Sequence, residues 1–271
     1  MSQPPFQFLS MLPAVTSTVA SLGRIQLFSD TWQRMILAQG HIAPEAYQQT
    51  DFADLRLDFP LSIQGAVAKR QAEYLAGRYL ARLAMQQSGL FDAQPPQLPI
   101  GRLRAPVWPE RVTGSVTHHR HKACVVVLTQ PLSAENFVGV DTELWLSAQQ
   151  ASDIAASIHH ADELTILLKA GFSNAMATSL LFSAKEALFK AICPFVDDYF
   201  GFEAAELTGC SGLDNRTPAA CRSGWLQLQL VTDWVIAKAP QQNYHCWFSC
   251  SASDVLTLVC SDALHDLWCG S

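Results

Sequence analysis

Residues 123–144 read ACVVVLTQPLSAENFVGVDTEL, and this stretch predicts two β-strands joined by a turn. Its first six residues, Ala123 to Leu128, form an apolar run with three consecutive β-branched valines that is typical of a buried strand. The segment from Thr129 to Glu135 contains a proline and predicts a turn, and Phe137 to Leu144 predicts a second strand. We therefore expect these two strands to pair in an antiparallel hairpin.

Helices are predicted on both sides of these strands. From Gly65 to Gln87 apolar residues recur at helical spacing, and Gly89 follows as a C-cap. A longer helical region is expected from about Ser147 to Ile192, with a break near Gly171 and an end at Pro194. Three alternating apolar runs near the C-terminus predict strands of an antiparallel sheet, at residues 225–231, 244–250 and 255–260.

The order of helix, strands, helices and strands indicates an α+β fold. We expect two similar halves related by a pseudo-two-fold axis, each a small and mainly antiparallel sheet packed with helices. The N-terminal half is predicted to span residues 1–133 and the C-terminal half residues 134–271, although no internal sequence repeat is strong enough to demonstrate duplication.

The composition is typical of a folded protein, since 49% of the 271 residues are hydrophobic and 15% are charged. The formal net charge of −6 gives no indication of nucleic-acid binding. No basic residue precedes Arg24, so the N-terminus lacks the charged start of a signal peptide. No apolar run reaches the roughly 18 residues of a membrane span. We expect a cytoplasmic protein with reduced cysteines and no integral membrane segment.

Charge is distributed unevenly along the chain. Residues 69–122 contain nine basic and three acidic residues, a sum of +6. Residues 197–271 contain nine acidic and three basic residues, a sum of −6. This segregation indicates a local site for an anion in the middle of the chain, and chance segregation on a solvated surface is the alternative.

The segment Val138-Gly-Val-Asp141-Thr-Glu143 places two carboxylates on one face of a predicted strand, because side chains alternate along a strand. Two adjacent carboxylates repel each other unless a cation lies between them. A hard divalent ion such as Mg²⁺ prefers oxygen ligands of this kind. The alternative is a pair of solvated acids at the end of a strand.

The segment Phe182-Ser-Ala-Lys185-Glu186-Ala-Leu-Phe189-Lys190 places Glu186 and Lys190 four residues apart on one face of a helix. A surface ion pair would explain this spacing. The neighbouring residues are largely apolar, however, so the helix is predicted to be buried, and a buried glutamate needs a partner or a metal ion.

Two further segments are suited to an anion. Gly114-Ser115-Val-Thr117-His118 predicts a turn that offers backbone N–H groups, followed by a histidine. Arg70 and Arg78 are eight residues apart, just over two helical turns, so they lie on one face of the helix and suit a phosphate. Solvated helix arginines are the alternative.

In this order and spacing, the segments resemble the Sfp-type 4′-phosphopantetheinyl transferases, and within them the branch that contains enterobactin synthase component D. The resemblance runs from about residue 66 to residue 206. The matching segments are Lys69-Arg70-x-x-Glu73-x-x-Ala76-Gly77-Arg78, Ala105-Pro106-x-Trp108-Pro109, Gly114-Ser115-x-Thr117-His118, Val138-Gly-Val-Asp141-x-Glu143, Phe182-Ser-Ala-Lys185-Glu186-Ala-x-Phe189-Lys190 and Gly201-Phe202-Glu203. The chain departs from the pattern at Phe189, where many relatives have tyrosine, and at Gln71, which replaces a frequent arginine.

The resemblance implies roles for the acidic and lysine residues. Asp141, Glu143 and Glu186 are expected to hold Mg²⁺, which neutralises the pyrophosphate of coenzyme A. Glu186 is also expected to act as the base for the acceptor hydroxyl. Lys190 is expected to offset charge on the leaving phosphate, and Lys185 to contact the same region of coenzyme A.

The resemblance also implies which residues bind the nucleotide end of coenzyme A. Arg70, Arg78 and His118 match the positions that hold its 3′-phosphate. Ser115 belongs to the same segment as His118 and is expected to bond a phosphate. The contacts to adenine are not assignable, because the match is thin in the N-terminal region.

The implied activity is transfer of the 4′-phosphopantetheine group from coenzyme A to a serine of apo carrier protein domains, with release of adenosine 3′,5′-bisphosphate. The branch implies acyl, aryl or peptidyl carriers of siderophore synthesis. We expect a monomer, since two pseudo-two-fold halves within one chain are compatible with one. A broader transferase that also serves fatty acid or polyketide carriers is one alternative. A non-catalytic protein that binds coenzyme A is another, but it would keep the arginines and lose the acids, and all the acids are present here.

Overall fold

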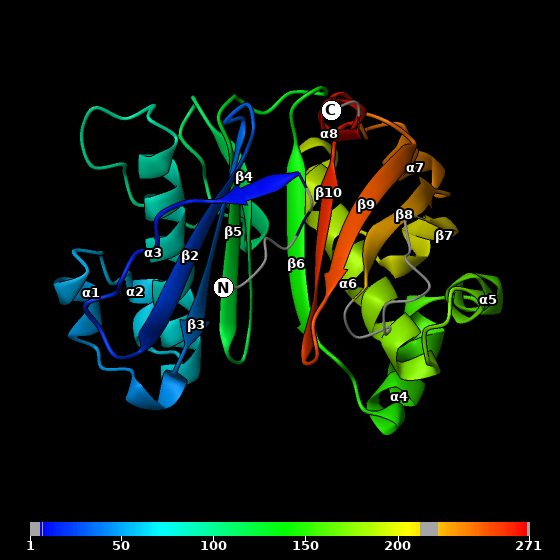
Figure 1. Ribbon diagram of the computed structural model, residues 1–271, viewed down its shortest axis with the longest axis horizontal. Coiled ribbons are helices and arrows are strands. Elements are labelled where there is room, and N and C mark those ends of the chain that lie inside the picture. The colour runs from blue at the N-terminus through cyan, green and yellow to red at the C-terminus, as the bar shows by residue number, and fades with distance from the viewer. Residues whose placement is uncertain (1–5, 7, 212–221, 270–271) are drawn as a thin grey trace. The chain divides into compact units, whose positions relative to one another are not determined.

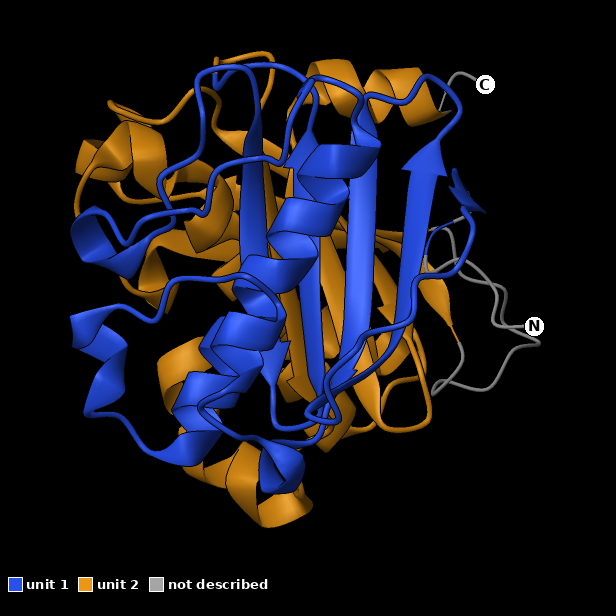
Figure 2. Cartoon of the chain, turned by 90° about the vertical axis from the view of Figure 1, so that its left-hand side faces the viewer, with its two compact units in different colours: residues 1–132 blue, residues 133–271 orange. Residues whose placement is uncertain are grey.

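The computed structural model describes residues 6, 8–211 and 222–269. The chain divides into two compact units, residues 1–132 (unit 1) and residues 133–271 (unit 2), which Figure 2 shows in different colours. Each unit contains a five-stranded antiparallel sheet and one long helix packed against it. The predicted α+β fold with two similar halves is therefore confirmed.

The sheet of unit 1 has the strand order β1-β2-β3-β5-β4, and every neighbouring pair is antiparallel. Its strands are β1 (Leu9–Met11), β2 (Leu22–Asp30), β3 (Met35–Ile42), β4 (Thr113–His119) and β5 (Lys122–Leu128). The helix α3 (Ala68–Gln87) crosses one face of this sheet, as Figure 2 shows, and contacts β3, β5 and β4. The shorter helices of unit 1 are η1 (Pro44–Ala46), α1 (Asp51–Asp54), α2 (Leu61–Gln64) and η2 (Arg102–Arg104).

The core of unit 1 forms between α3 and the sheet because both elements present small or branched apolar side chains there. Val125 and Val127 alternate toward the helix, and Ala72, Leu80 and Ala84 of α3 are fully or almost fully buried against the sheet. The helix ends as predicted, since Gly89 adopts the left-handed conformation at φ 69° that glycine favours after a helix.

The sheet of unit 2 has the strand order β6-β10-β9-β8-β7 and is also antiparallel throughout. Its strands are β6 (Val138–Leu144), β7 (Ala205–Ser211), β8 (Ser223–Leu230), β9 (Asn243–Cys250) and β10 (Asp254–Cys260) (Figure 1). The strands β8, β9 and β10 confirm the three runs predicted near the C-terminus.

The long helix α6 (Asn174–Val196) packs against β6, β10 and β9. The other helices of unit 2 are α4 (Ala148–Ile158), α5 (Ala161–Lys169), η3 (Phe202–Ala204), α7 (Asp233–Ile236) and α8 (Asp262–Cys269). Ser147 caps α4 by accepting a hydrogen bond from the backbone of Gln150, and Ser173 caps α6 by accepting one from Met176. The predicted helical region therefore breaks twice, once before α5 and once near Gly171.

Three local predictions were wrong. β5 and β6 do not form a hairpin, because both edges of β5 are already taken by β3 and β4, and β6 pairs with β10 instead. The segment around Gly114 and Ser115 is strand β4 rather than a turn. Pro194 does not end α6, which continues to Val196. A proline so close to the end of a helix removes only one hydrogen bond, and buried Ile192 and Val196 hold the last turn against the core.

Among the described residues, no single helix is long and apolar enough to cross a membrane. Helices α5 and α6 meet the length and composition of a span only when taken together, and they are bent by 114° relative to each other.

Candidate functional site

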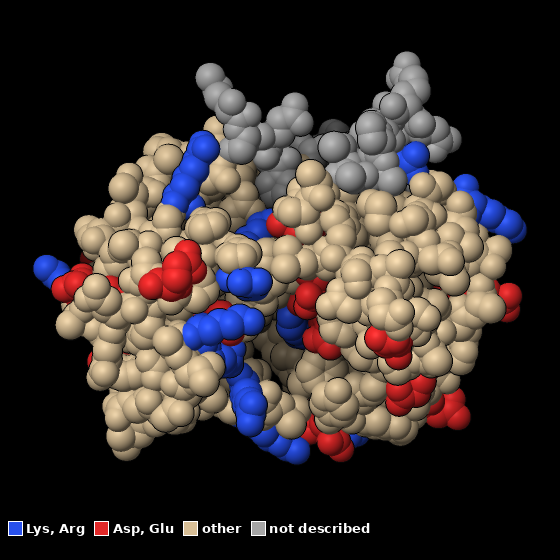
Figure 3. Space-filling model, turned by 90° about the horizontal axis from the view of Figure 1, so that it is seen from below, with Lys and Arg blue, Asp and Glu red and all other residues tan. Residues whose placement is uncertain are grey.

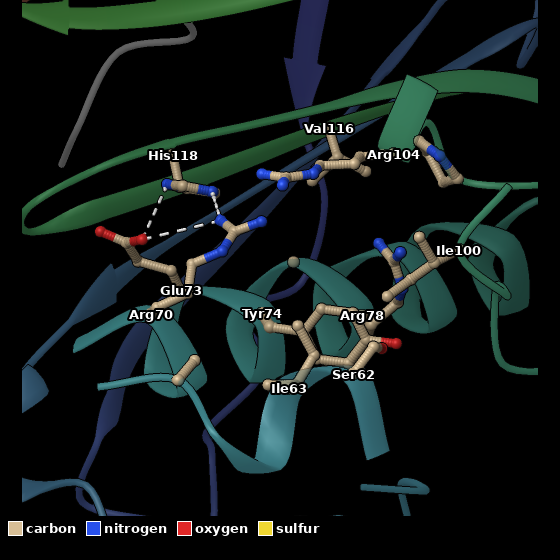
Figure 4. A pocket seen from close by; sticks show the side chains of 13 residues that line it. Ser62, Ile63, Arg70, Glu73, Tyr74, Arg78, Ile100, Arg104, Val116 and His118 are labelled. Atoms are coloured by element: carbon tan, nitrogen blue, oxygen red, sulfur yellow. Dashed lines mark hydrogen bonds and ion pairs between the residues drawn. The ribbon is translucent and has the colours of Figure 1, made fainter. Parts of the chain in front are cut away.

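Unit 1 contains a pocket of about 470 Å³ between α3, the end of β4 and the segment around η2. It is lined by Ser62, Ile63, Ala66, Arg70, Glu73, Tyr74, Gly77, Arg78, Ile100, Arg104, Pro106, Val116 and His118. Figure 4 shows Arg70, Glu73 and His118 together at one side of this pocket, and Arg78 near Ile100 at the other. Three of the residues predicted to bind the 3′-phosphate thus line one cavity.

A glycine lets α3 approach β4 closely enough to form the pocket. A Cβ added at Gly77 would lie 3.0 Å from Cγ1 of Val116, so a larger residue would push the helix away from the strand. Arg70 and Arg78 lie two turns apart on the same side of α3, which is why both reach the pocket.

Arg70, His118 and Glu73 form a connected polar cluster. Nη1 of Arg70 lies 2.7 Å from Nε2 of His118. Oε2 of Glu73 lies 3.5 Å from Nδ1 of His118 and 3.7 Å from Nη1 of Arg70. These contacts, drawn as dashed lines in Figure 4, leave Arg70 and His118 in defined positions at the pocket wall.

Arg78 is almost completely buried, with 7% of its surface exposed. Its guanidinium lies over the ring of Tyr74, 4.6 Å from the ring centre. Its Nε has no hydrogen-bond partner among the described residues, and burial lowers the pKa of the guanidinium. A buried cation with an unused donor beside a cavity is suited to an anionic ligand.

The pocket also differs from the sequence-based expectation. Ser115 does not line it, because strand alternation directs Ser115 away from the face that carries Val116 and His118. Its contact with a phosphate stays a prediction. Sequence reasoning did not place Arg104, Tyr74 or Glu73 in the pocket.

A second group of predicted residues lies in unit 2, on β6 and α6. A Cβ at Gly139 would overlap the carbonyl oxygen of Ala187 and lie 2.5 Å from the backbone nitrogen of Ala191. Gly139 therefore allows β6 to lie directly against α6. This contact brings Asp141, two residues further along β6, next to the side chain of Lys190, where Asp141 Oδ1 and Lys190 Nζ are 2.6 Å apart.

The acidic residues of this group influence one another electrostatically. Burial raises the pKa of Glu143 to about 7, helped by the charge of Asp141 and opposed by that of Lys190. Burial also raises the pKa of Glu186, with Lys190 opposing and Asp141 adding to the shift. Three carboxylates and one ammonium thus share a half-buried region in which negative charge is in excess.

The chemistry of these donors fits a hard cation such as Mg²⁺, because the donor atoms are carboxylate oxygens whose ionised forms are mutually destabilising. In the part of the chain that the structure describes, no group of three or more His, Cys, Asp or Glu side chains is arranged so that it could hold a metal ion. Binding of Mg²⁺ by Asp141, Glu143 and Glu186 therefore stays a prediction.

Lys185 lies in a different environment from its neighbour Glu186. Its Nζ lies 2.8 Å from Oε1 of Glu163 and donates to the carbonyl of Ile158 at 2.8 Å. Glu163 also accepts hydrogen bonds from the backbone of Leu207 and of His160. This buried ion pair connects α6 to α5 and β7, and a contact between Lys185 and coenzyme A stays a prediction.

A small cavity of about 60 Å³ lies beside Glu186. Its lining is mostly aromatic and consists of Phe189, Tyr199, Phe200 and Phe202 with Gly201, Lys185 and Glu186. The ring centres of Phe189 and Phe200 are 4.9 Å apart, so the cavity wall is a packed aromatic cluster.

Two protein-family models match the chain, one in each unit. The 4′-phosphopantetheinyl transferase N-terminal domain matches residues 60–128, which include the whole pocket lining of unit 1. The 4′-phosphopantetheinyl transferase superfamily matches residues 137–246, which include the acidic residues and lysines of unit 2.

Individual proteins are similar over parts of the chain. Enterobactin synthase component D of Salmonella austin is 35% identical over 199 residues, which cover 73% of this chain and 74% of that protein. Enterobactin synthase component D of Escherichia coli O157:H7 is 40% identical over 129 residues, covering 48% of this chain and 58% of that protein. The 4′-phosphopantetheinyl transferase Npt of Nocardia iowensis is 32% identical over 148 residues, covering 54% and 62% respectively.

The chain spans 58% of the length of several of these relatives, including the protein of Escherichia coli O157:H7. The match to the protein of Salmonella austin is more extensive, at 35% identity over 74% of its length. Together with the two family models, this match shows that the chain belongs to the 4′-phosphopantetheinyl transferase superfamily.

Proposed function

We propose that this protein transfers the 4′-phosphopantetheine group from coenzyme A to a serine of apo carrier protein domains, in a reaction that requires Mg²⁺. The single observation that carries the proposal is that a member of this superfamily has Arg70, Arg78 and His118 lining one pocket. A 3′-phosphate distinguishes coenzyme A from most other nucleotides, and a pocket with two arginines and a histidine suits it.

The pocket of unit 1 would bind the nucleotide end of the donor. Arg78 offers a buried Nε–H that has no hydrogen-bond partner among the described residues, and Arg70 offers N–H donors beside His118 at the opposite side of the same cavity. The apolar side chains of Ile63 and Ile100 also line the cavity and are suited to the non-phosphate part of a nucleotide.

The residues of unit 2 would carry the transfer. Glu186 would accept the proton of the serine hydroxyl, and its raised pKa makes it a stronger base than an ordinary carboxylate. The serine oxygen would form a bond to the phosphorus that carries pantetheine, and the bond from that phosphorus to the remaining nucleotide would break. Adenosine 3′,5′-bisphosphate would leave, with Lys190 offsetting its charge.

Mg²⁺ held by Asp141, Glu143 and Glu186 would supply the positive charge that neutralises the pyrophosphate. The raised pKa values of Glu143 and Glu186 support this assignment, because burial, their largest cause, removes the solvent that stabilises an ionised carboxylate, and a bound cation would stabilise it instead.

The names of the relatives support carrier domains of siderophore synthesis as acceptors, since several are enterobactin synthase component D. We place the reaction in the cytoplasm and expect the protein to act as a monomer.

The test is to incubate the protein with coenzyme A, Mg²⁺ and several apo carrier domains, and to measure the intact mass of each carrier. We expect at least one siderophore-type carrier to gain the mass of one phosphopantetheine, and the gain to disappear with EDTA or in Glu186→Gln. No gain with any carrier would contradict the proposed activity. A gain that survives EDTA would contradict the role of Mg²⁺.

A further inference from the structure

Glu73 is a carboxylate in a pocket whose other charged lining residues, among those the structure describes, are the arginines Arg70, Arg78 and Arg104. Only 7% of its surface is exposed, and it lies on α3 among the first two turns of the helix. Its Oε2 faces Arg70 and His118, while its Oε1 lies 3.8 Å from Nζ of Lys69. A negative charge beside an anion site weakens binding of the anion, so its presence there needs a compensating effect.

The contacts determine which nitrogen of His118 carries the proton in the neutral ring. An arginine can only donate hydrogen bonds, so the 2.7 Å contact makes Nε2 of His118 the acceptor from Arg70. The ring proton then lies on Nδ1, the atom that faces Oε2 of Glu73. Glu73 therefore restrains His118 and Arg70 at the same time (Figure 4).

We propose that Glu73 is a positioning residue that holds Arg70 and His118 in the orientation that receives the 3′-phosphate of coenzyme A, and so sets donor affinity rather than the rate of transfer. The inference rests on the proposed function, because it takes the 3′-phosphate as the ligand of this pocket. The side chain of Arg70 is 44% exposed, whereas that of Glu73 is 9% exposed. The buried carboxylate can thus hold a side chain that would otherwise lose many rotamers when the ligand binds.

Substitution of Glu73 separates two effects of opposite sign. If its charge mattered only through repulsion, Glu73→Gln would strengthen binding of coenzyme A, because a negative charge is removed from the pocket. If Glu73 positions Arg70 and His118, Glu73→Gln weakens binding of coenzyme A, because the neutral amide no longer attracts Arg70. The sign of the change therefore decides between the two.

The test compares the wild type with Glu73→Gln and Glu73→Asp, using coenzyme A and dephospho-coenzyme A as donors for one carrier domain. The dissociation constant of each donor is measured by calorimetry, and kcat and KM by transfer. We expect Glu73→Gln to raise KM and Kd for coenzyme A roughly tenfold, as the loss of one charged hydrogen bond does. It should leave kcat within about twofold of the wild type, because the variant loses binding that is equal in the ground and transition states. Glu73→Asp keeps the charge and should recover part of the affinity.

Dephospho-coenzyme A should respond little to Glu73→Gln, because it lacks the group that Arg70 and His118 receive. In an Arg70→Ala background, Glu73→Gln should raise KM and Kd for coenzyme A by a smaller factor than it does in the wild type, because Glu73 acts partly through Arg70. Lys69→Ala is the matched control, because Lys69 also contacts Glu73 but does not line the pocket. Its affinity for coenzyme A should equal that of the wild type.

Tighter or unchanged binding of coenzyme A by Glu73→Gln would overturn the inference. An equal loss with both donors would also overturn it, because Glu73 would then only support the fold. A wild-type protein that binds coenzyme A but transfers nothing would contradict the proposed activity, and the dissociation constants would still decide the role of Glu73.

Discussion

At the scale of single residues, Glu143 links the proposed metal site to stability. Its pKa rises from 4.5 to about 7, first because of burial and then because of the charge of Asp141. Between those two pH values the folded protein binds a proton that the unfolded chain has released, so the free energy of unfolding falls as pH rises. Well above pH 7 Glu143 is ionised in both states, and the folded protein carries the full free-energy cost of burying this charge.

Glu143→Gln removes the free-energy cost of burying an ionised carboxylate at this position. In the absence of divalent cations we expect the variant to have a higher Tm than the wild type at about pH 8, and the difference to vanish at about pH 5, where Glu143 is protonated in the folded protein. Thermal unfolding at several pH values measures it. A difference in Tm that does not change with pH would contradict the account of Glu143.

Mg²⁺ provides a second measurement on the same variant. Any ligand that binds only the folded state raises its stability. Addition of Mg²⁺ should therefore raise the Tm of the wild type more than that of Glu143→Gln. Equal increases in both proteins would remove Glu143 from the proposed metal site.

At the scale of secondary-structure elements, the ion pair of Lys185 and Glu163 connects α6 to α5 and β7. Breaking a buried ion pair by removing one partner typically costs about 3–5 kcal/mol, because the remaining charge stays buried without its partner. Lys185→Met should therefore lower the Tm markedly. Adding Glu163→Gln should recover part of the loss, because a neutral amide replaces the uncompensated carboxylate and can still accept from the backbone of Leu207.

Kinetics of the same two variants separate a structural role of Lys185 from binding of coenzyme A. If the ion pair is structural, KM for coenzyme A should stay close to the wild-type value in the double variant, measured well below its Tm. A KM that rises in Lys185→Met and is not restored by Glu163→Gln would instead support direct contact between Lys185 and the donor.

Regular periodicity made some elements predictable and not others. The helix α3 and the strands β8 to β10 follow clear apolar patterns, and the structure confirms them. The strands β2 and β3 were not predicted, because β3 and the second half of β2 are buried on both faces and carry no alternation of polar and apolar residues. The hairpin between β5 and β6 was predicted from proximity in the sequence, but strand pairing also depends on partners far along the chain.

In the candidate site, too, local sequence patterns predicted positions along one helix but not contacts between distant segments. Spacing alone placed Arg70 and Arg78 on one face of a helix, and both line the pocket. The partner of Lys185 is 22 residues earlier in the chain, and no local pattern connects the two. Arg104 is the last residue of the short helix η2 in a proline-rich segment and has a left-handed backbone at φ 61°, a conformation that periodicity cannot predict.

At the scale of the whole molecule, Lys and Arg side chains gather in one part of the face drawn in Figure 3. The exposed arginines between residues 102 and 122 are Arg102, Arg104, Arg111 and Arg120. Carrier domains of the type proposed here are commonly acidic, so we propose that the exposed arginines of residues 102–122 take part in docking, and their charge would mainly accelerate association.

Charge reversal tests the docking surface without touching the pocket. Arg111 and Arg120 do not line the cavity of unit 1, whereas Arg104 does. Arg111→Glu with Arg120→Glu should lower kcat/KM for the carrier and flatten its dependence on salt, while KM for coenzyme A stays unchanged. Unchanged carrier kinetics at low salt would rule out this surface.

We propose that the pocket of unit 1 recognises the donor and that the acidic residues of unit 2 carry the transfer. The most direct measurement is kcat/KM for coenzyme A and for dephospho-coenzyme A with one carrier domain, in the wild type, Arg78→Ala and Glu186→Gln. Loss of a charged hydrogen bond to the 3′-phosphate should lower kcat/KM for coenzyme A roughly ten- to a hundredfold in Arg78→Ala, with a far smaller effect on dephospho-coenzyme A. Glu186→Gln should lose most transfer with both donors and keep the wild-type ratio between them. If Arg78→Ala weakened both donors equally, Arg78 would be structural, and the pocket would not be the site of the 3′-phosphate.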